Sequence, residues 1–173
     1  MEADTLLAKA VTGEDGKAVF EADVPFGRYY IKELQAPAGF VSSDAVIDVT
    51  ASYQGQEVEV VRLTEVFKNQ PTTTEFTKTD LTTGVELSGA TLTVLDKKGN
   101  EIDTWTSVKG KPHIIKRLQA GEMYILRETF APYGYLKAEE VEFTISDTEK
   151  VQKVEMKDEV PTGRILISKR VSS

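Results

Sequence analysis

Apolar and polar residues alternate along most of this chain, in short runs that are separated by turn residues. The runs 29–33 and 124–128 are clear examples, because aromatic or aliphatic side chains recur at every second position. This period of two predicts β-strands with one face turned toward a core. The runs recur roughly every 8 to 12 residues, which is typical of β-sandwiches, and no stretch has a helical apolar period. The pattern therefore predicts an all-β chain.

The predicted strands are separated by strong turn signals. In the first part of the chain, the dipeptide Asp15-Gly16 predicts a tight hairpin between the alternating runs 5–10 and 17–20. Other strands in this part are expected to end at Glu33, to run through 46–49 and to lie within 56–69. In the later part, strands are expected at 75–80, 90–95, 102–105, 114–118, 124–128, 140–145 and 151–158.

One stretch of sequence occurs twice. Tyr29–Phe40 and Tyr124–Tyr135 share the pattern Glu-x-x-Ala-Pro-x-Gly-aromatic, with Glu33 aligned to Glu128. An internal repeat in a chain of 173 residues favours two domains of similar size. The polar stretch Gln70–Thr74 contains a proline that interrupts any central strand, so we place the domain boundary there.

The strand pattern begins a third time near the end of the chain. Arg164–Lys169 is similar to the lysine-bearing run Glu75–Lys78, whereas the first domain has no such opening strand. We therefore predict a first domain, 1–70, that lacks its first strand, and a complete second domain, 71–160. Residues 161–173 are predicted to be a linker and the first strand of a following domain, or a donor strand for the first domain. We expect the chain to be a piece of a longer protein.

Composition and charge exclude several classes of function. The net charge of −7 disfavours a nucleic-acid or anionic-membrane partner, and no apolar run approaches the ~20 residues of a membrane span. The chain has no cysteine, which excludes disulfides and thiolate metal sites. With a single histidine, His113, and no spaced acidic loop, we predict no metal and no cofactor.

The alternation places three charged side chains on inward faces of the second domain. Lys78 shares a face with Phe76, Asp158 shares one with Met156, and Glu128 follows the apolar positions of its own strand. Burying these charges is costly, and burial favours a neutral amine and a protonated carboxyl. A neutral amine held against a carboxyl group is an effective nucleophile. We predict an amide bond between the Lys78 and Asp158 side chains, with loss of water and with Glu128 as proton shuttle.

The first domain carries an incomplete version of the same set. Its acid is Glu33, and Asn69 corresponds to Asp158, so that bond formation there would release ammonia. Its lysine is missing, and Lys169 is the candidate donor, from the same or a neighbouring molecule. We regard this strand exchange as a further hypothesis, in which the C-terminal strand completes the first domain.

These motifs resemble a known family. They are similar to B-type repeats of collagen-binding surface proteins and of Gram-positive shaft pilins. The similarity is carried by the run Thr77–Asp80 followed by Thr83-Gly84, by the tripeptide Ser88–Ala90, by the repeated stretch and by the terminal Asn or Asp. The resemblance implies tandem immunoglobulin-like sandwiches of inverse, prealbumin-like topology. It also implies glutamate-assisted Lys-Asn or Lys-Asp isopeptide bonds between first and last strands. Aspartate at position 158, in place of the commoner asparagine, is a departure that the family tolerates.

The resemblance implies a structural stalk of a secreted, cell-wall-anchored adhesin or pilin. Its partners would be neighbouring repeats of the same polypeptide, and a host matrix protein or glycan would bind through other domains. One alternative is a ligand-binding module, with Trp105 or Phe130 in an exposed patch. Another is an engineered domain for covalent strand capture through Asn69. An enzyme with turnover is disfavoured, because the reactive set consumes itself.

Overall fold

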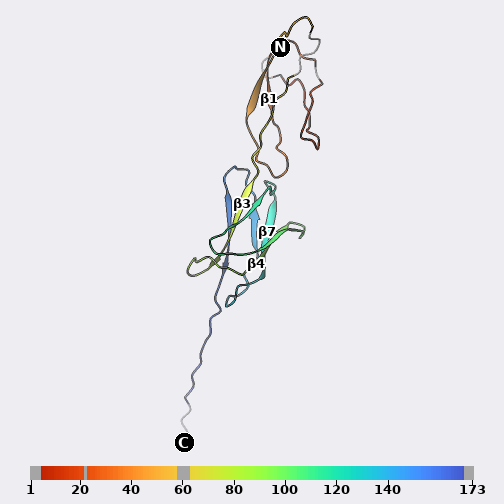
Figure 1. Ribbon diagram of the computed structural model, residues 1–173. Helices are drawn as coiled ribbons and strands as arrows, with labels where there is room; N and C mark the ends of the chain where they lie inside the picture. Colours follow the sequence, from red (N-terminus) through yellow and green to blue (C-terminus); the bar gives the residue numbers. More distant parts are fainter. Residues whose placement is uncertain (1–4, 22, 58–62, 170–173) are drawn as a thin grey trace. The chain divides into compact units, whose positions relative to one another are not determined.

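The structure is a computed structural model (Figure 1), which describes residues 5–21, 23–57 and 63–169. The described residues form nine β-strands and no helix, so the predicted all-β fold class is confirmed. It follows that no helix among these residues has the length and apolar character needed to cross a membrane. The chain divides into two compact units: unit 1 is Met1–Glu33 with Asp44–Phe67, and unit 2 is Leu34–Ser43 with Lys68–Ser173.

The described residues of unit 1 form one antiparallel pair of strands, β1 (Gly27–Lys32) and β2 (Val46–Ala51). The expected turn at Asp15-Gly16 is formed, with the Gly13 amide donating to the Lys17 carbonyl over 2.9 Å. The runs on either side of this turn are not strands, so that part of the hairpin prediction was wrong. Apolar side chains in them are exposed, 66% for Leu6 and 75% for Val19, so alternation here marks no face packed on a sheet.

The strand predicted within 56–69 is only partly covered by the structure. Residues 58–62 lie outside the described residues, and residues 63–69 form no strand. Val66, which the alternation assigned to this strand, is 70% exposed. An apolar alternation without a sheet to cover it gains little from burial, which is the main contribution that stabilises a strand in a sandwich.

Unit 2 is a sandwich of two sheets. One sheet has the order β6-β3-β9, and the other has the order β5-β4-β7-β8. The strands are β3 (Thr73–Asp80), β4 (Thr91–Asp96), β5 (Glu101–Thr106), β6 (His113–Lys116), β7 (Met123–Phe130), β8 (Val141–Thr144) and β9 (Gln152–Asp158). All seven correspond to strands predicted from the alternation, which was therefore a reliable signal in this part of the chain.

The first and last strands of unit 2 are parallel neighbours. β3 and β9 pair from Thr74 opposite Gln152 to Asp80 opposite Asp158, whereas the other strand pairs are antiparallel. Parallel strands cannot be joined by a tight hairpin and need a long crossover. Here the strands β4 to β8 form that crossover, so residues far apart in sequence become neighbours at the ends of β3 and β9.

The core of unit 2 lies between its two sheets. Its buried members include Phe76, Val94, Leu126, Val154 and Met156, which come from strands of both sheets and are at most 5% exposed. Phe76 contacts Phe143 edge to face, with ring centroids 5.5 Å apart. Side chains packed in this way leave little room for water, so a charged group in the same layer is poorly solvated.

The segment Leu34–Ser43 packs as part of unit 2, although the sequence analysis assigned it to the first domain. Its Gly39 carbonyl accepts from the Thr72 amide over 3.0 Å, and the Arg117 guanidinium lies 5.0 Å from the centre of the Phe40 ring. Gly39 has φ +81°, and a Cβ atom there would lie 2.5 Å from the Arg117 carbonyl oxygen. A glycine is therefore required at this close approach.

Candidate functional site

Three strands of unit 2 carry charged side chains into its core: Lys78 on β3, Glu128 on β7 and Asp158 on β9. They are 3%, 0% and 0% exposed. Strand geometry accounts for the burial, because every second residue of β9 is buried and Asp158 continues the face of Val154 and Met156. The structure thus brings together the three residues that the sequence analysis singled out in the second domain.

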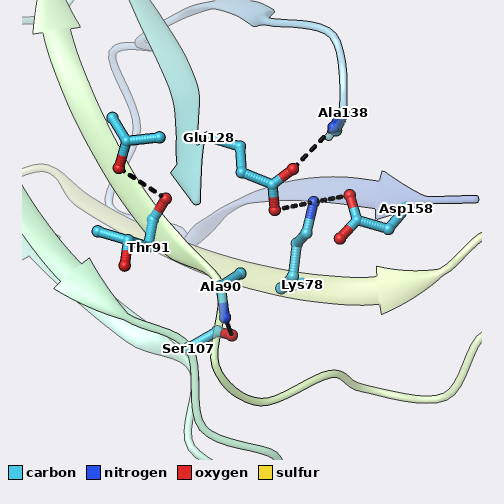
Figure 2. A network of polar contacts seen from close by, with 8 residues as sticks. Lys78, Ala90, Thr91, Ser107, Glu128, Ala138 and Asp158 are labelled. Carbon is cyan, nitrogen blue, oxygen red and sulfur yellow. Dashed lines mark hydrogen bonds and ion pairs between the residues drawn. The ribbon is translucent and has the colours of Figure 1, made fainter. Parts of the chain in front are cut away.

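The amine of Lys78 lies between the two carboxyl groups (Figure 2). Its Nζ is 3.1 Å from Glu128 Oε1 and in direct contact with Asp158 Oδ1. The second Glu128 oxygen, Oε2, accepts a hydrogen bond of 2.7 Å from the Ala138 amide. Within the described part of the chain, Asp158 Oδ2 has no hydrogen-bond partner. The amine and the two carboxyl groups are therefore close enough for proton transfer and for nucleophilic attack.

The electrostatics favour a protonated carboxyl in this cluster. Burial raises the pKa of Asp158; the hydrogen bond and charge of Lys78 oppose this effect, and the Glu128 carboxyl adds to it. One ammonium against two carboxylates would leave a net negative charge in a dry site, which is costly. Uptake of one proton removes that charge. If the ammonium then passes one proton to Glu128 Oε1, 3.1 Å away, the site holds a neutral amine against a neutral Asp158 carboxyl, which is the state from which an amide can form.

Neighbouring side chains keep water away from the three groups. Lys78 pairs across the parallel ladder with Met156, and Glu128 pairs with Leu92 of β4. Met156 is 0% exposed and Leu92 is 1% exposed. In such surroundings electrostatic interactions are stronger than in water, and an unpaired charge costs more.

The Ala138 amide is a contributor that sequence reasoning missed. A backbone N–H carries no signal in residue type, and the amide lies ten positions after Glu128, in the loop between β7 and β8. The repeated stretch was the only available signal, because it indicated that the residues after Glu128 form a defined bend.

The candidate residues of the first domain are placed differently. Glu33 directly follows β1 in unit 1, and Asn69 belongs to unit 2; both are partly buried. Lys169 is exposed, in a segment 161–169 that forms no strand. The predicted roles of Glu33, Asn69 and Lys169 in a second bond stay predictions, as do the chemical roles of the cluster around Lys78.

The aromatic and histidine candidates belong to a packed surface cluster. The Trp105 ring stacks on His113, with centroids 4.1 Å apart, and also contacts Phe76 at 5.3 Å. His113 Nε2 lies 2.7 Å from Asp103 Oδ2. In the part of the chain that the structure describes, no three histidine, aspartate or glutamate side chains gather in a metal-binding group.

Several solved structures resemble the chain. The Bacillus anthracis TIE protein is 28% identical with a TM-score of 0.55, and the match covers 87% of this chain and 28% of that one. A streptococcal ancillary pilin is 29% identical over 80% of this chain and 43% of its own, with a TM-score of 0.44. The shaft pilin SpaA of Lactobacillus rhamnosus GG is 17% identical over 91% of this chain and 69% of its own, with a TM-score of 0.47. The chain spans less than half the length of the first two proteins.

Among curated proteins, none matches the chain. A family model does match, under the description SpaA prealbumin-like fold domain, at residues 2–64 and 72–160. These two regions make up more than half of the chain; the first ends before the polar linker and the second begins within it. The resemblance inferred from the repeated stretch and the lysine-bearing strand is thereby confirmed. The chain belongs to the SpaA family of prealbumin-like fold domains.

Proposed function

We propose that this chain is a structural repeat of a cell-surface stalk on Gram-positive bacteria, stabilised by an isopeptide bond between Lys78 and Asp158. The observation that carries the proposal is the burial of the Lys78 amine between two carboxyl groups, with all three side chains in the core. Family membership supports the structural role. Fully buried ion clusters are a poor source of stability, so a chemical purpose explains this one better than packing does.

The proposed reaction balances without any other reactant. The neutral Lys78 amine attacks Cγ of the protonated Asp158 carboxyl, which forms the C–N bond. The protonated Glu128 carboxyl donates its proton to the departing hydroxyl, which leaves as water, and the resulting Glu128 carboxylate accepts a proton from the nitrogen. Glu128 returns to its starting state. The amide consumes both reacting groups, so each molecule reacts once and no turnover follows.

The position of the bond suits a stalk that carries tension. Lys78 and Asp158 lie on the first and last strands of unit 2, which are hydrogen-bonded neighbours. A covalent link between these strands prevents their separation when the chain is pulled. It also closes a long loop, and so takes the place of disulfides in a chain that has no cysteine.

Mass spectrometry of the intact protein tests the proposal. The wild type is expected to be lighter than its sequence by one water molecule, with a crosslinked peptide that contains Lys78 and Asp158. Glu128→Ala should keep the full mass. Glu139→Ala, which removes an exposed glutamate near the same site, should behave as the wild type. A wild-type protein at full mass, with Lys78 and Asp158 in separate peptides, would refute the proposed bond.

We also propose strand exchange as a second candidate function, because one observation favours it. Ile165, Leu166 and Ile167 are 86%, 92% and 90% exposed, so no sheet among the described residues covers this apolar segment, which is suited to a strand. Lys169 would then join Asn69 of another copy with the help of Glu33, and ammonia would leave. A covalent ladder on a denaturing gel that disappears in Lys169→Ala would support this candidate, and a clean monomer would exclude it.

A further inference from the structure

The loop 131–138, which is the first part of the connection between β7 and β8, is tied to the strand that carries Lys78. The Tyr135 hydroxyl donates to Asp80 Oδ2 over 3.0 Å. Asp80 is the last residue of β3 and lies two positions after Lys78. The loop is therefore anchored on one side to the same strand that presents the amine.

The same loop is also tied to the other two members of the cluster. The Leu136 amide donates to the Glu159 carbonyl over 2.9 Å, and Glu159 directly follows Asp158. The Ala138 amide donates to Glu128 Oε2 over 2.7 Å (Figure 2). Three points of one short loop thus contact β3, β7 and the residue that directly follows β9.

Asp80 is a firmly held acceptor for the tyrosine. Its Oδ1 accepts from the Thr82 amide at 2.9 Å, from the Thr83 amide at 2.7 Å and from the Thr83 hydroxyl at 2.9 Å. These bonds, chiefly the one from the Thr83 amide, lower the pKa of Asp80 and keep it charged. The hydrogen bond to Asp80 in turn raises the pKa of Tyr135, so the hydroxyl remains a donor. The other carboxylate oxygen of Asp80, Oδ2, accepts the hydrogen bond from Tyr135 that anchors the loop.

The Ala138 amide matters because a glutamate carboxyl rotates easily about its terminal torsion. With Oε2 fixed by Ala138, Oε1 is directed at the Lys78 amine, 3.1 Å away. Proton transfer needs heavy atoms within roughly 2.6 to 3.2 Å, and a misplacement of about 1 Å can cost on the order of a hundredfold in rate. The placement of the Ala138 amide therefore bears on the reaction.

The first copy of the repeat shows that the loop backbone does not require this hydroxyl. Phe40 occupies the position of Tyr135, yet its amide donates to the Pro37 carbonyl over 3.1 Å, as that of Tyr135 does to Pro132. The glycines that precede Phe40 and Tyr135 have φ +81° and +87°. The hydroxyl is thus an addition in the copy with the complete reactive set, and its removal is compatible with the fold of the loop.

We propose that Tyr135 is a positioning residue for bond formation: its hydroxyl anchors the loop to Asp80 so that the Ala138 amide orients the Glu128 carboxyl. This inference rests on the proposed function, because it concerns the rate of the same reaction. Tyr135 itself touches neither of the reacting groups, and it acts through the loop.

Tyr135→Phe tests the role, since it removes one oxygen atom and leaves a residue that the first copy already uses. Full chains are produced by cell-free synthesis, stopped in acidic denaturant at successive times and weighed for the loss of water. We expect bond formation about ten- to a hundredfold slower than in the wild type. Tyr133→Phe is the matched control, because Tyr133 is fully exposed in the same loop and its loss should leave the rate unchanged.

A spectroscopic measurement separates positioning from general stability. In the Lys78→Met background, where no bond can form, adding Tyr135→Phe should move the Ala138 amide proton resonance upfield, whereas adding Tyr133→Phe should leave it in place. The midpoint of thermal unfolding should change little in either case. An unmoved Ala138 resonance, or a slow reaction explained by a large loss of stability, would contradict the positioning role.

The remaining outcomes are distinguishable. If the wild type forms no bond, the proposed function fails, and the inference fails with it. If the wild type forms the bond and Tyr135→Phe is as fast as Tyr133→Phe, only the inference is overturned. Should Tyr135→Phe not fold, Asp80→Ser carries the test, because the serine hydroxyl can still accept from the Thr83 amide, whereas its side chain has no second polar atom for the Tyr135 hydroxyl. That variant is expected to react slowly, and wild-type speed would overturn the inference.

Discussion

The cluster around Lys78 is expensive to bury as three separate groups. Lys78 and Asp158 have fully buried side chains, and Glu128 adds a second carboxyl to the same site. Desolvation of such ions costs several kcal/mol each, and their mutual attraction recovers only part of that cost. An amide between Lys78 and Asp158 replaces two charges with one neutral polar group. The unreacted charged groups therefore destabilise the fold, and forming the bond between Lys78 and Asp158 relieves that cost.

A variant that cannot form the bond should reveal the cost of the buried acid. In Lys78→Met, Asp158 keeps its carboxyl, whose pKa is raised by burial. A raised pKa in the folded state stabilises the fold below the pKa of the unfolded chain, about 3.9, and this contribution is lost as the pH rises through the folded pKa. We expect Lys78→Met to be less stable in urea at pH 7 than at pH 4, by about 1.4 kcal/mol for each unit of pKa shift.

The double variant Lys78→Met with Asp158→Asn is the control for this pH dependence. It has no titrating group at position 158, so the part of the slope that Asp158 causes should vanish. A Lys78→Met protein whose stability changes with pH in the same way as that of the double variant would contradict the raised pKa of Asp158.

At the residue scale, sequence reasoning identified the three buried charged side chains but not the loop contacts that orient them. Lys78, Glu128 and Asp158 could be assigned to inward faces because each continues an alternating run with apolar neighbours. The contact between Tyr135 and Asp80 joins residues 55 positions apart and depends on how one loop bends. Neither its partners nor its geometry follows from a period of two along a strand.

At the scale of elements, the parallel pair of β3 and β9 decides where a crosslink can act. Lys78 and Asp158 are 80 positions apart in sequence, yet they lie near the same ends of neighbouring strands. A bond between them encloses every other strand of unit 2 in one loop. In the chain-entropy description of crosslinks, the benefit grows with the length of the closed loop.

Glu128→Gln should reveal that contribution, because it removes the acid while preserving the volume of the side chain. For a loop of 80 positions the lost stabilisation is expected to be about 4 to 5 kcal/mol. The measurement is the urea midpoint of the unreacted variant compared with that of the wild type. Glu139→Gln, at an exposed position, should leave the midpoint unchanged. Equal midpoints for Glu128→Gln and the wild type would show that the bond adds nothing to stability.

Gly39 and Gly134 occupy equivalent positions in the two copies of the repeated stretch, so substitutions at these positions can be compared directly. Both have positive φ, so alanine is strained at either position. A Cβ atom at Gly39 would also lie 2.5 Å from the Arg117 carbonyl oxygen, whereas one at Gly134 meets nothing within 4 Å. We expect Gly39→Ala to cost about 1 to 3 kcal/mol more than Gly134→Ala. Hydrogen exchange at the Val41 and Thr72 amides should rise only in Gly39→Ala, and equal effects of both variants would contradict the close contact.

The strands were predictable where alternation coincides with a sheet that covers one face. In unit 2 the alternating runs pack on a common core, and the predicted strands correspond to β3 to β9. Around Asp15-Gly16 the same kind of alternation leaves Val11 91% exposed, and only the turn forms. A period of two along a strand predicts which residues share a face. Whether a second sheet packs on that face depends on residues far away in sequence.

At the scale of the whole molecule, the proposed stalk function depends on where force enters and leaves unit 2. The chain enters β3 at Thr73 and leaves β9 at Asp158, and these strands run parallel. With the bond in place, tension passes along β3 to Lys78, across the amide and out beyond Asp158. The strands between them carry none of it. Family membership made the fold foreseeable, but this load path depends on which two residues react.

Single-molecule pulling from the two ends of the chain should show the load path directly. In the wild type, the stretch between Lys78 and Asp158 is expected to stay folded or to stay short even when its hydrogen bonds break. In Glu128→Ala, unfolding of unit 2 should release about 260 to 290 Å more extended chain, because 80 residue positions each contribute at most about 3.3 to 3.6 Å. The same added length in the wild type would show that force passes through the fold and not through a covalent link. A difference confined to Glu128→Ala, with Glu139→Ala matching the wild type, ties the mechanical role to the acid beside Lys78.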